Sequence, residues 1–165
     1  TQSLRFKTLS KIKRVTPNLA PSAHLSWQEV NCRDGTPYPE DWRTTRLHRL
    51  TTMFEDFRAL VGHHPLVIGS CYRTPSWNRK QGGAQKSQHV RGTAIDVHCP
   101  KVMLIDEFRT LAKQFATDDD RVGGLGWYTW GVHLDVRPHT TFAFWNQVTR
   151  QTRLHDNNET PRTQW

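Results

Sequence analysis

The apolar residues between Asp41 and Val61 recur at intervals of three and four, which predicts an amphipathic helix with one buried face. The positions that set this interval are Leu47, Leu50, Phe54, Phe57 and Leu60. A second helix is predicted over residues 103–116, "MLIDEFRTLAKQFA", on the same grounds. Its inner face would hold Leu104, Ile105, Phe108, Leu111, Ala112 and Phe115. Ser26 stands three residues before Glu29, a capping-box pattern that predicts a short helix there.

Three other stretches have the β-branched and aromatic composition that predicts strands. They are "LVIGSCYR" at 66–73, "GTAIDVHC" at 92–99 and "GVHLDVRP" at 131–138. The glycine-containing segment 74–89 predicts a long loop, which in a compact domain is commonly functional, and residues 118–130 predict a turn-rich connection. The order helix, strand, strand, helix, strand predicts a small single α+β domain, with an antiparallel sheet and helices packed on one side.

The chain of 165 residues suits one domain that buries its core without disulfide bonds. We expect this domain over residues 25–145, with a basic N-terminal arm over 1–24 and a polar, aperiodic C-terminal arm over 146–165. No apolar run has the length of a membrane span. The basic start lacks the apolar core of a signal peptide, so we expect another route, or a removed signal, if the protein leaves its cell.

A formal net charge of +8 predicts attraction to polyanions such as nucleic acid, an anionic membrane or an anionic cell-wall polymer. The basic residues are scattered, and their one cluster consists of Arg5, Lys7, Lys11, Lys13 and Arg14. We interpret that cluster as a solvated arm and keep nucleic-acid binding as a less favoured alternative. Cys32, Cys71 and Cys99 have no C-x-x-C spacing, which argues against a zinc ribbon and leaves open one disulfide or none.

Two of the predicted strands carry acids and imidazoles on a single face. Because alternate side chains of a strand share a face, Asp96 lies with His98, and His133 lies with Asp135 and Arg137. The opposite, apolar face is formed by Ile95, Val97, Val132, Leu134 and Val136. Half-buried carboxylates and imidazoles are tolerated only when they are paired or bound to metal. The pattern therefore indicates a polar site above a buried core.

His89, Asp96 and His133 together offer two nitrogens and one oxygen, a donor set that suits zinc. Three protein ligands leave a fourth position for water, which is typical of a catalytic site, and zinc lowers the pKa of that water towards about 7. Asp135 lies roughly 7 Å along the strand from His133 and is our candidate for the base. Arg73, at the exit of the first strand, could hold a substrate carboxylate or a polarised carbonyl with its planar fork.

Three segments of the chain resemble the D-alanyl-D-alanine carboxypeptidase-type zinc peptidases, a group related to the lysostaphin-type enzymes and the hedgehog signalling domain. "SQHVRGTAIDV" matches the pattern S-x-H-x-x-G-x-A-x-D of that family. "CYRTPSWNRKQGGAQKSQH" resembles the segment leading into this motif, and "GWYTWGVHLDVRP" resembles the second metal segment in the branch that carries H-x-D. The resemblance covers roughly residues 25 to 145, with the three segments in the family's order.

The resemblance implies that His89, Asp96 and His133 bind Zn²⁺ and that Arg73 binds substrate and stabilises the transition state. It also implies that Ser87 is a hydrogen-bond partner of the ligands, the kind of contact that tunes a metal site. Gly92 would form the turn between loop and strand. Four aromatic residues could wall the cleft, although core packing explains each of them equally well: Trp77, Trp127, Tyr128 and Trp130.

The sequence departs from the family pattern at one position. Many relatives carry Glu or Asp as catalytic base three residues before the last zinc histidine, and here that residue is Trp130. An indole cannot move the proton, so we expect Asp135 to act as the base. The alternatives are His98 or His139 as base, or a loss of catalysis. We favour structural or rim positions for these two histidines.

These observations predict a zinc peptidase that hydrolyses peptide stems or cross-links of bacterial peptidoglycan, by D,D- or L,D-type cleavage. We expect a monomer that acts on the cell wall and whose basic charge provides adhesion to anionic wall polymers. A small wall hydrolase without a visible signal suggests a phage or viral endolysin. The alternatives are a non-catalytic, zinc-containing module that binds the wall or a partner, and a nucleic-acid-binding protein.

Overall fold

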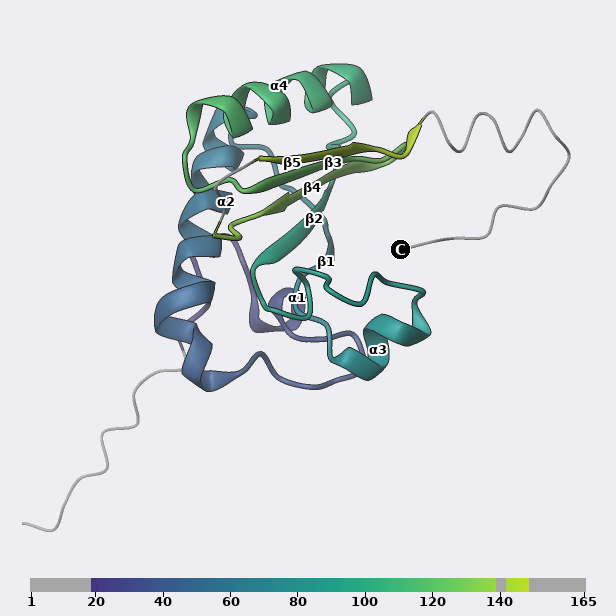
Figure 1. The fold of residues 1–165 in the computed structure, drawn as a ribbon. Helices are drawn as coiled ribbons and strands as arrows, with labels where there is room; N and C mark the ends of the chain where they lie inside the picture. Colours follow the sequence, from purple (N-terminus) through teal and green to yellow (C-terminus); the bar gives the residue numbers. More distant parts are fainter. Residues whose placement is uncertain (1–18, 139–141, 149–165) are drawn as a thin grey trace, which may run out of the picture.

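The computed structural model describes residues 19–138 and 142–148, which form a sheet covered by helices (Figure 1). The helices are α1 (Trp27–Val30), α2 (His48–Leu60), α3 (Pro75–Lys80) and α4 (Ile105–Asp118). The strands are β1 (Ile68–Ser70), β2 (Ala94–His98), β3 (Gly124–Trp127), β4 (Gly131–Asp135) and β5 (Ala143–Asn146). Within the described residues the sheet order is β1-β2-β4-β3-β5, and the neighbours are antiparallel except for the parallel pair β3 and β5. The predicted α+β class is confirmed.

The local sequence explains where the first helices begin and end. The Ser26 hydroxyl accepts a hydrogen bond from the Glu29 N–H at 3.3 Å, and the Glu29 carboxylate accepts one from the Ser26 N–H at 2.8 Å, so the predicted capping box starts α1. The long predicted helix begins with a 3-10 turn (Glu40–Trp42) and a π turn (Arg43–Leu47) before it becomes α2. It stops before Gly62, whose φ of 86° is readily adopted by glycine.

The hydrophobic core lies between the sheet and the two long helices. The predicted alternation is confirmed for Ile95, Val97, Val132 and Leu134, which are fully buried. The ring of Phe57 on α2 meets those of Phe108 and Phe115 on α4 at centroid distances of 5.5 Å and 5.4 Å, so both helices pack into one core. Because side chains alternate along a strand, the acids and imidazoles of β2 and β4 lie on the other face of the sheet.

Three elements differ from the sequence-based prediction. The loop 74–89 contains α3, where Thr74 accepts a hydrogen bond from the Trp77 N–H at 3.2 Å and Pro75 occupies the first helical position. The segment predicted as a turn-rich connection contains β3, and β5 follows the last predicted strand. Glycine is disfavoured in strands and β5 is only four residues long, so neither strand has a strong signal in the sequence.

The two glycines of β3 leave room for side chains from neighbouring strands. A Cβ at Gly124 would lie 2.3 Å from Asp135 Oδ2, and a Cβ at Gly126 would lie 2.4 Å from Cε2 of Trp145. A glycine inside a strand often marks such a close approach. These glycines therefore leave space beside β3 for an acid of β4 and an indole of β5.

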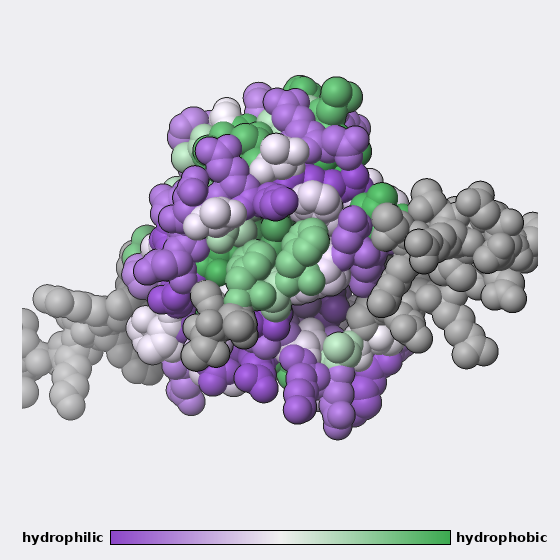
Figure 2. Space-filling model, turned by 45° about the horizontal axis from the view of Figure 1, so that its top comes forward, coloured by the Kyte–Doolittle hydropathy of each residue, from purple (hydrophilic) through white to green (hydrophobic). Residues whose placement is uncertain are grey.

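Residues 1–18, 139–141 and 149–165, including most of both predicted arms and the basic N-terminal cluster, lie outside the described residues. In the part of the chain that is described, no helix has the length and apolar character needed to cross a bilayer. All three cysteines are free thiols. Figure 2 shows a largely hydrophilic surface with a hydrophobic patch near its centre. Exposed large apolar side chains include Leu104, Phe142 and Phe144.

Candidate metal centre

The three predicted metal ligands come together from separate parts of the chain. His89 stands in the loop before β2, Asp96 is on β2 and His133 is on β4. Asp96 and His133 are directly opposite each other in the antiparallel register of β2 and β4, which fixes their spacing. Ligand atoms of all three residues lie within 4.8 Å of one another, and all three side chains are buried. The sheet register and one loop therefore build this cluster.

His89 presents a defined nitrogen to the cluster. Its Nδ1 lies 2.6 Å from the carbonyl oxygen of Cys71, and because a carbonyl only accepts, the Nδ1–H donates there. Nε2 then carries the lone pair and faces Asp96 Oδ2 at 3.1 Å. Burial lowers the pKa of His89, which favours this neutral form. Neutral imidazole with one nitrogen fixed by a backbone carbonyl is the form in which histidine binds metals.

His133 lies between two carboxylates, one at each ring nitrogen. Nδ1 is 2.8 Å from Asp96 Oδ1, and Nε2 is 3.0 Å from Asp135 Oδ2. Burial opposes a charged ring, but the hydrogen bonds to Asp135 and Asp96 outweigh it and raise the pKa of His133 to about 9. With Nε2–H donating to Asp135, a cation bound between the ring and Asp96 would take the place of the proton on Nδ1.

The donors of the cluster fit a cation. With His89 and His133 fixed at their outer nitrogens, Nε2 of His89 and Nδ1 of His133 both face the Asp96 carboxylate. Although burial alone would raise it, the pKa of Asp96 is held well below its usual range by His89 and His133, so this acid is ionised. Lone pairs on two imidazoles and a carboxylate repel one another unless a proton or a metal ion lies between them. Two nitrogens and one oxygen, each oriented by an outer partner, form a zinc-type set.

Arg73 contacts the cluster directly. Its Nη2 donates to Asp96 Oδ2 at 2.9 Å, and its Nε donates to the hydroxyl of Ser70 at 2.8 Å. The side chain is only 11% exposed, so the guanidinium is held in place and has little contact with bulk water. Sequence reasoning located Arg73 near the site but missed Ser70, a small polar residue without a motif of its own.

Asp135, the predicted base, is paired with His133 and Arg137. It contacts Nε2 of His133, on the far side of the imidazole from Asp96 and the other ligand atoms. Arg137 holds both of its oxygens, with Nε donating to Oδ1 at 2.7 Å and Nη2 to Oδ2 at 2.5 Å. Asp135 has no exposed surface. A base must come within hydrogen-bonding distance of the water it deprotonates, and this carboxylate is separated from the cluster by the ring of His133.

The remaining predicted residues lie around the ligands. The Ser87 hydroxyl accepts a hydrogen bond from the His89 N–H at 3.2 Å and so braces the ligand loop. Gly92 has a φ of 68°, and its carbonyl accepts from the Tyr38 hydroxyl at 2.6 Å, consistent with the predicted turn. Tyr128 lines the same cavity as His89, and burial raises its pKa, which keeps its phenol protonated.

Trp145 is a site residue that the sequence reasoning missed. Its indole lies against His133, with ring centroids 4.8 Å apart, on the strand β5 that was not predicted. The signal available was the short apolar run "FAFW" between polar neighbours, which is consistent with a strand but also with a fragment of helix.

Two cavities open beside the cluster and share Arg73. The first, of about 320 Å³, contains Asp96, His98 and Trp130. The second, of about 290 Å³, contains His89 and His133. Among the aromatic residues predicted to wall a cleft, Trp77 and Trp130 line the first cavity and Tyr128 lines the second, whereas Trp127 lines neither. His139, the other histidine considered as a base, lies outside the described residues.

This α+β sheet with a buried His-Asp-His cluster between two cavities has the form of a metallopeptidase site. The sequence model of the family described as Peptidase M15 matches residues 23–135. The chain therefore belongs to the Peptidase M15 family, and its resemblance to D-alanyl-D-alanine carboxypeptidase-type zinc peptidases is confirmed. No curated protein matches the sequence.

Proposed function

We propose that this chain is a zinc peptidase that hydrolyses peptide stems or cross-links of bacterial peptidoglycan. One observation carries the proposal: two imidazoles and a carboxylate, each fixed by an outer partner, turn their donor atoms towards one another between two cavities. The family supports a metallopeptidase acting on the wall. The D,D- or L,D-type of the cleaved bond is the finer part of the proposal.

In this mechanism His89, Asp96 and His133 would hold the metal. When bound, zinc would supply an activated water near neutral pH and a Lewis acid for the scissile carbonyl. The buried setting of the three ligands supports this role, because charge interactions are stronger where water is excluded.

Arg73 would stabilise the negative charge that develops on the scissile carbonyl oxygen. Its Nε and Nη2 are occupied by Ser70 and Asp96, and its guanidinium borders both cavities. A donor already fixed in a poorly hydrated position stabilises a developing oxyanion without reorganising. Tyr128, in the second cavity, would contact the substrate, and Ser87 would keep the His89 loop in place.

Asp135 would position His133 rather than remove a proton from the attacking water. It accepts a hydrogen bond at the outer nitrogen of the ring, and Arg137 fixes its carboxylate in turn. Such carboxylate–histidine pairs set the tautomer and the orientation of a metal ligand. This proposal replaces our sequence-based expectation that Asp135 is the base.

On this proposal His98 would be the general base that removes a proton from the attacking water. It is a partly exposed imidazole in the cavity that also contains Asp96 and Arg73, and its ring packs on Trp130 at a centroid distance of 4.4 Å. Imidazole is the side chain that most often performs general acid–base catalysis. Trp130, which stands where relatives carry an acid, would on this proposal orient the histidine.

At the level of the cell, the proposed enzyme is a monomeric wall hydrolase of the endolysin type from a phage or virus, with Zn²⁺ as its metal. The net charge of +8 would help it adhere to anionic wall polymers. A second candidate is a zinc-containing module that binds the wall without cleaving it. It is favoured by the combination of Trp130 at the position of the usual acid and an Asp135 without exposed surface.

Mass spectrometry of the muropeptides released from purified sacculi separates these candidates. The zinc-loaded protein should release defined fragments whose masses identify the cleaved bond. Release should stop when a chelator removes the metal and resume when zinc is restored. Tight sedimentation with sacculi without any released fragment would favour the binding module.

A further inference from the structure

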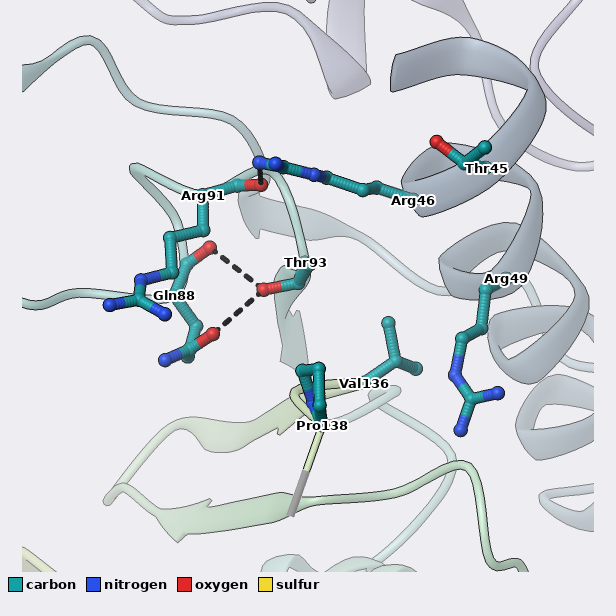
Figure 3. A pocket seen from close by; sticks show the side chains of 8 residues that line it. All are labelled: Thr45, Arg46, Arg49, Gln88, Arg91, Thr93, Val136 and Pro138. Atoms are coloured by element: carbon teal, nitrogen blue, oxygen red, sulfur yellow. Dashed lines mark hydrogen bonds between the residues drawn. The ribbon is translucent and has the colours of Figure 1, made fainter.

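A third cavity, of about 630 Å³, lies beside the site and is not used in the mechanism above (Figure 3). One wall is formed by Arg46 and by Arg49 of α2, and the opposite wall by Gln88 and Arg91 of the loop before β2. Val136, after the end of β4, contributes an apolar floor. We call this cavity the arginine groove.

The cations of the arginine groove form no salt bridge with a carboxylate among the described residues. Arg46 is held in place, because its Nη1 donates to the carbonyl of Arg91 at 2.9 Å and its guanidinium stacks over Trp42 at 3.9 Å. Arg49 lowers the pKa of Asp119 through its charge, but that acid is hydrogen-bonded by Arg121. Three guanidinium groups thus line one groove, and none of them forms a salt bridge with a carboxylate of the described residues.

The groove borders the cavity of the metal centre at Gln88. This residue lines both the groove and the cavity that contains the neighbouring His89. The hydroxyl of Thr93 donates to Gln88 Oε1 at 2.9 Å and reaches the Gln88 carbonyl at 3.3 Å, which fixes the wall between the cavities. Gln88 is therefore the residue over which an extended ligand bound at His89 would have to run to reach the groove.

We infer that the arginine groove is a substrate subsite that binds side-chain or terminal carboxylates of the peptide stem. Guanidinium groups pair with carboxylates through two parallel hydrogen bonds. Figure 3 shows the guanidinium groups of Arg46, Arg49 and Arg91 at separate places around the groove. This arrangement suits several acidic groups along an extended chain better than one small ion. The inference rests on the proposed function for the identity of the ligand, a wall peptide.

The test compares two stem peptides that differ only in their acidic groups, one with free carboxylates and one with these groups amidated. Each is titrated calorimetrically against the zinc-loaded full chain, and mass spectrometry checks that it remains intact. The free-acid peptide should bind about tenfold more tightly, in line with one or two charge-assisted hydrogen bonds. The double variant Arg49→Ala/Arg91→Ala should lose this preference, and so should Arg49→Gln/Arg91→Gln, which preserves more of the side-chain packing.

Lys113→Ala, which removes an exposed charge from α4, should keep the full preference and is the matched control. Equal affinity of the wild type for the two peptides would overturn the inference. The inference would also be overturned if the protein bound inorganic polyphosphate through these arginines but showed no preference for the free-acid peptide. Loss of preference in the double variant supports the subsite even if no sacculus fragment is ever released, because the titration does not require turnover.

Discussion

The metal centre and the arginine groove share Gln88 as a border and differ in how their charged side chains are paired. In the centre each acid has its partners within about 3 Å: Asp96 contacts Arg73 and both imidazoles, and Asp135 contacts Arg137 and His133. In the groove no guanidinium group forms a salt bridge with a carboxylate of the described residues, and Arg49 only acts on Asp119 through its charge. Buried charges must be neutralised by the fold itself, whereas charges with access to water, such as those of Arg49 and Arg91, are tolerated without a salt bridge until a ligand binds. The difference predicts large effects from substitutions in the centre and smaller, salt-sensitive effects in the groove.

The largest effect is expected for His89→Ala. Removing one of three ligands leaves two that do not complete a zinc site, so both bound zinc and release of muropeptides should fall to background. Elemental analysis after dialysis measures the zinc content. His48→Ala, an exposed histidine on α2, should retain one zinc per chain. Stoichiometric zinc in the His89 variant would show that the ligand set is wrong.

Arg73→Ala should bind zinc normally and lose about 10²–10³-fold in kcat, the usual cost of removing one oxyanion donor. The measurement is the steady-state hydrolysis of a soluble muropeptide at saturating zinc. Arg79→Ala, an exposed arginine at the end of α3, serves as the control and should be unaffected. A kcat within a factor of about two of the wild type would contradict a role in transition-state stabilisation.

His98→Gln tests the proposed proton transfer. Loss of a general base commonly costs about 10²–10⁴-fold, so kcat should fall within this range while zinc content and thermal stability stay unchanged. The chain offers His48→Gln as a matched substitution outside the site. Unchanged turnover in the His98 variant would show that another group is the general base.

Asp135→Asn separates positioning from proton transfer. If Asp135 orients His133, zinc affinity should fall about 10–100-fold, while kcat at saturating zinc should change much less. Competition with a fluorescent chelator measures the affinity. A kcat reduced by about 10²-fold or more at full zinc occupancy would instead restore Asp135 as the base.

The smallest effect belongs to the groove. Arg49→Ala should raise KM for sacculi only a few-fold and leave kcat unchanged, because the charge of this exposed residue is screened by salt. The difference from wild type should shrink as the salt concentration rises in turbidity assays. A difference that is independent of salt would show that Arg49 acts through packing instead of through charge.

Two of the three cluster residues, Asp96 and His133, could be predicted because they lie on strands that alternate polar and apolar positions, whereas His89 precedes β2 and was found through its motif. That alternation placed Asp96 and His133 on a shared face, and their pairing in the sheet follows from the antiparallel register. The function of Asp135 could not be predicted in the same way. Alternation assigns a side chain to a face but does not say which nitrogen of His133 turns towards it.

Other features were hidden because they depend on contacts between distant segments. Trp145 reaches His133 through the parallel pairing of β3 and β5, and such non-local pairing leaves little trace in a short run of residues. The pairing of Asp135 with Arg137 could be predicted from their spacing on one strand face. The complete burial of Asp135 could not. Burial without any exposed surface is a product of the whole fold.

The two glycines of β3 limit how this enzyme can be redesigned. Gly124 and Gly126 carry hydrogen atoms where Asp135 and Trp145 need space, so even a methyl group there would collide with the supports of His133. A strand that contributes no metal ligand thus limits which substitutions the metal centre can tolerate. Changes of specificity should be sought in the loop walls, and β3 should be left untouched.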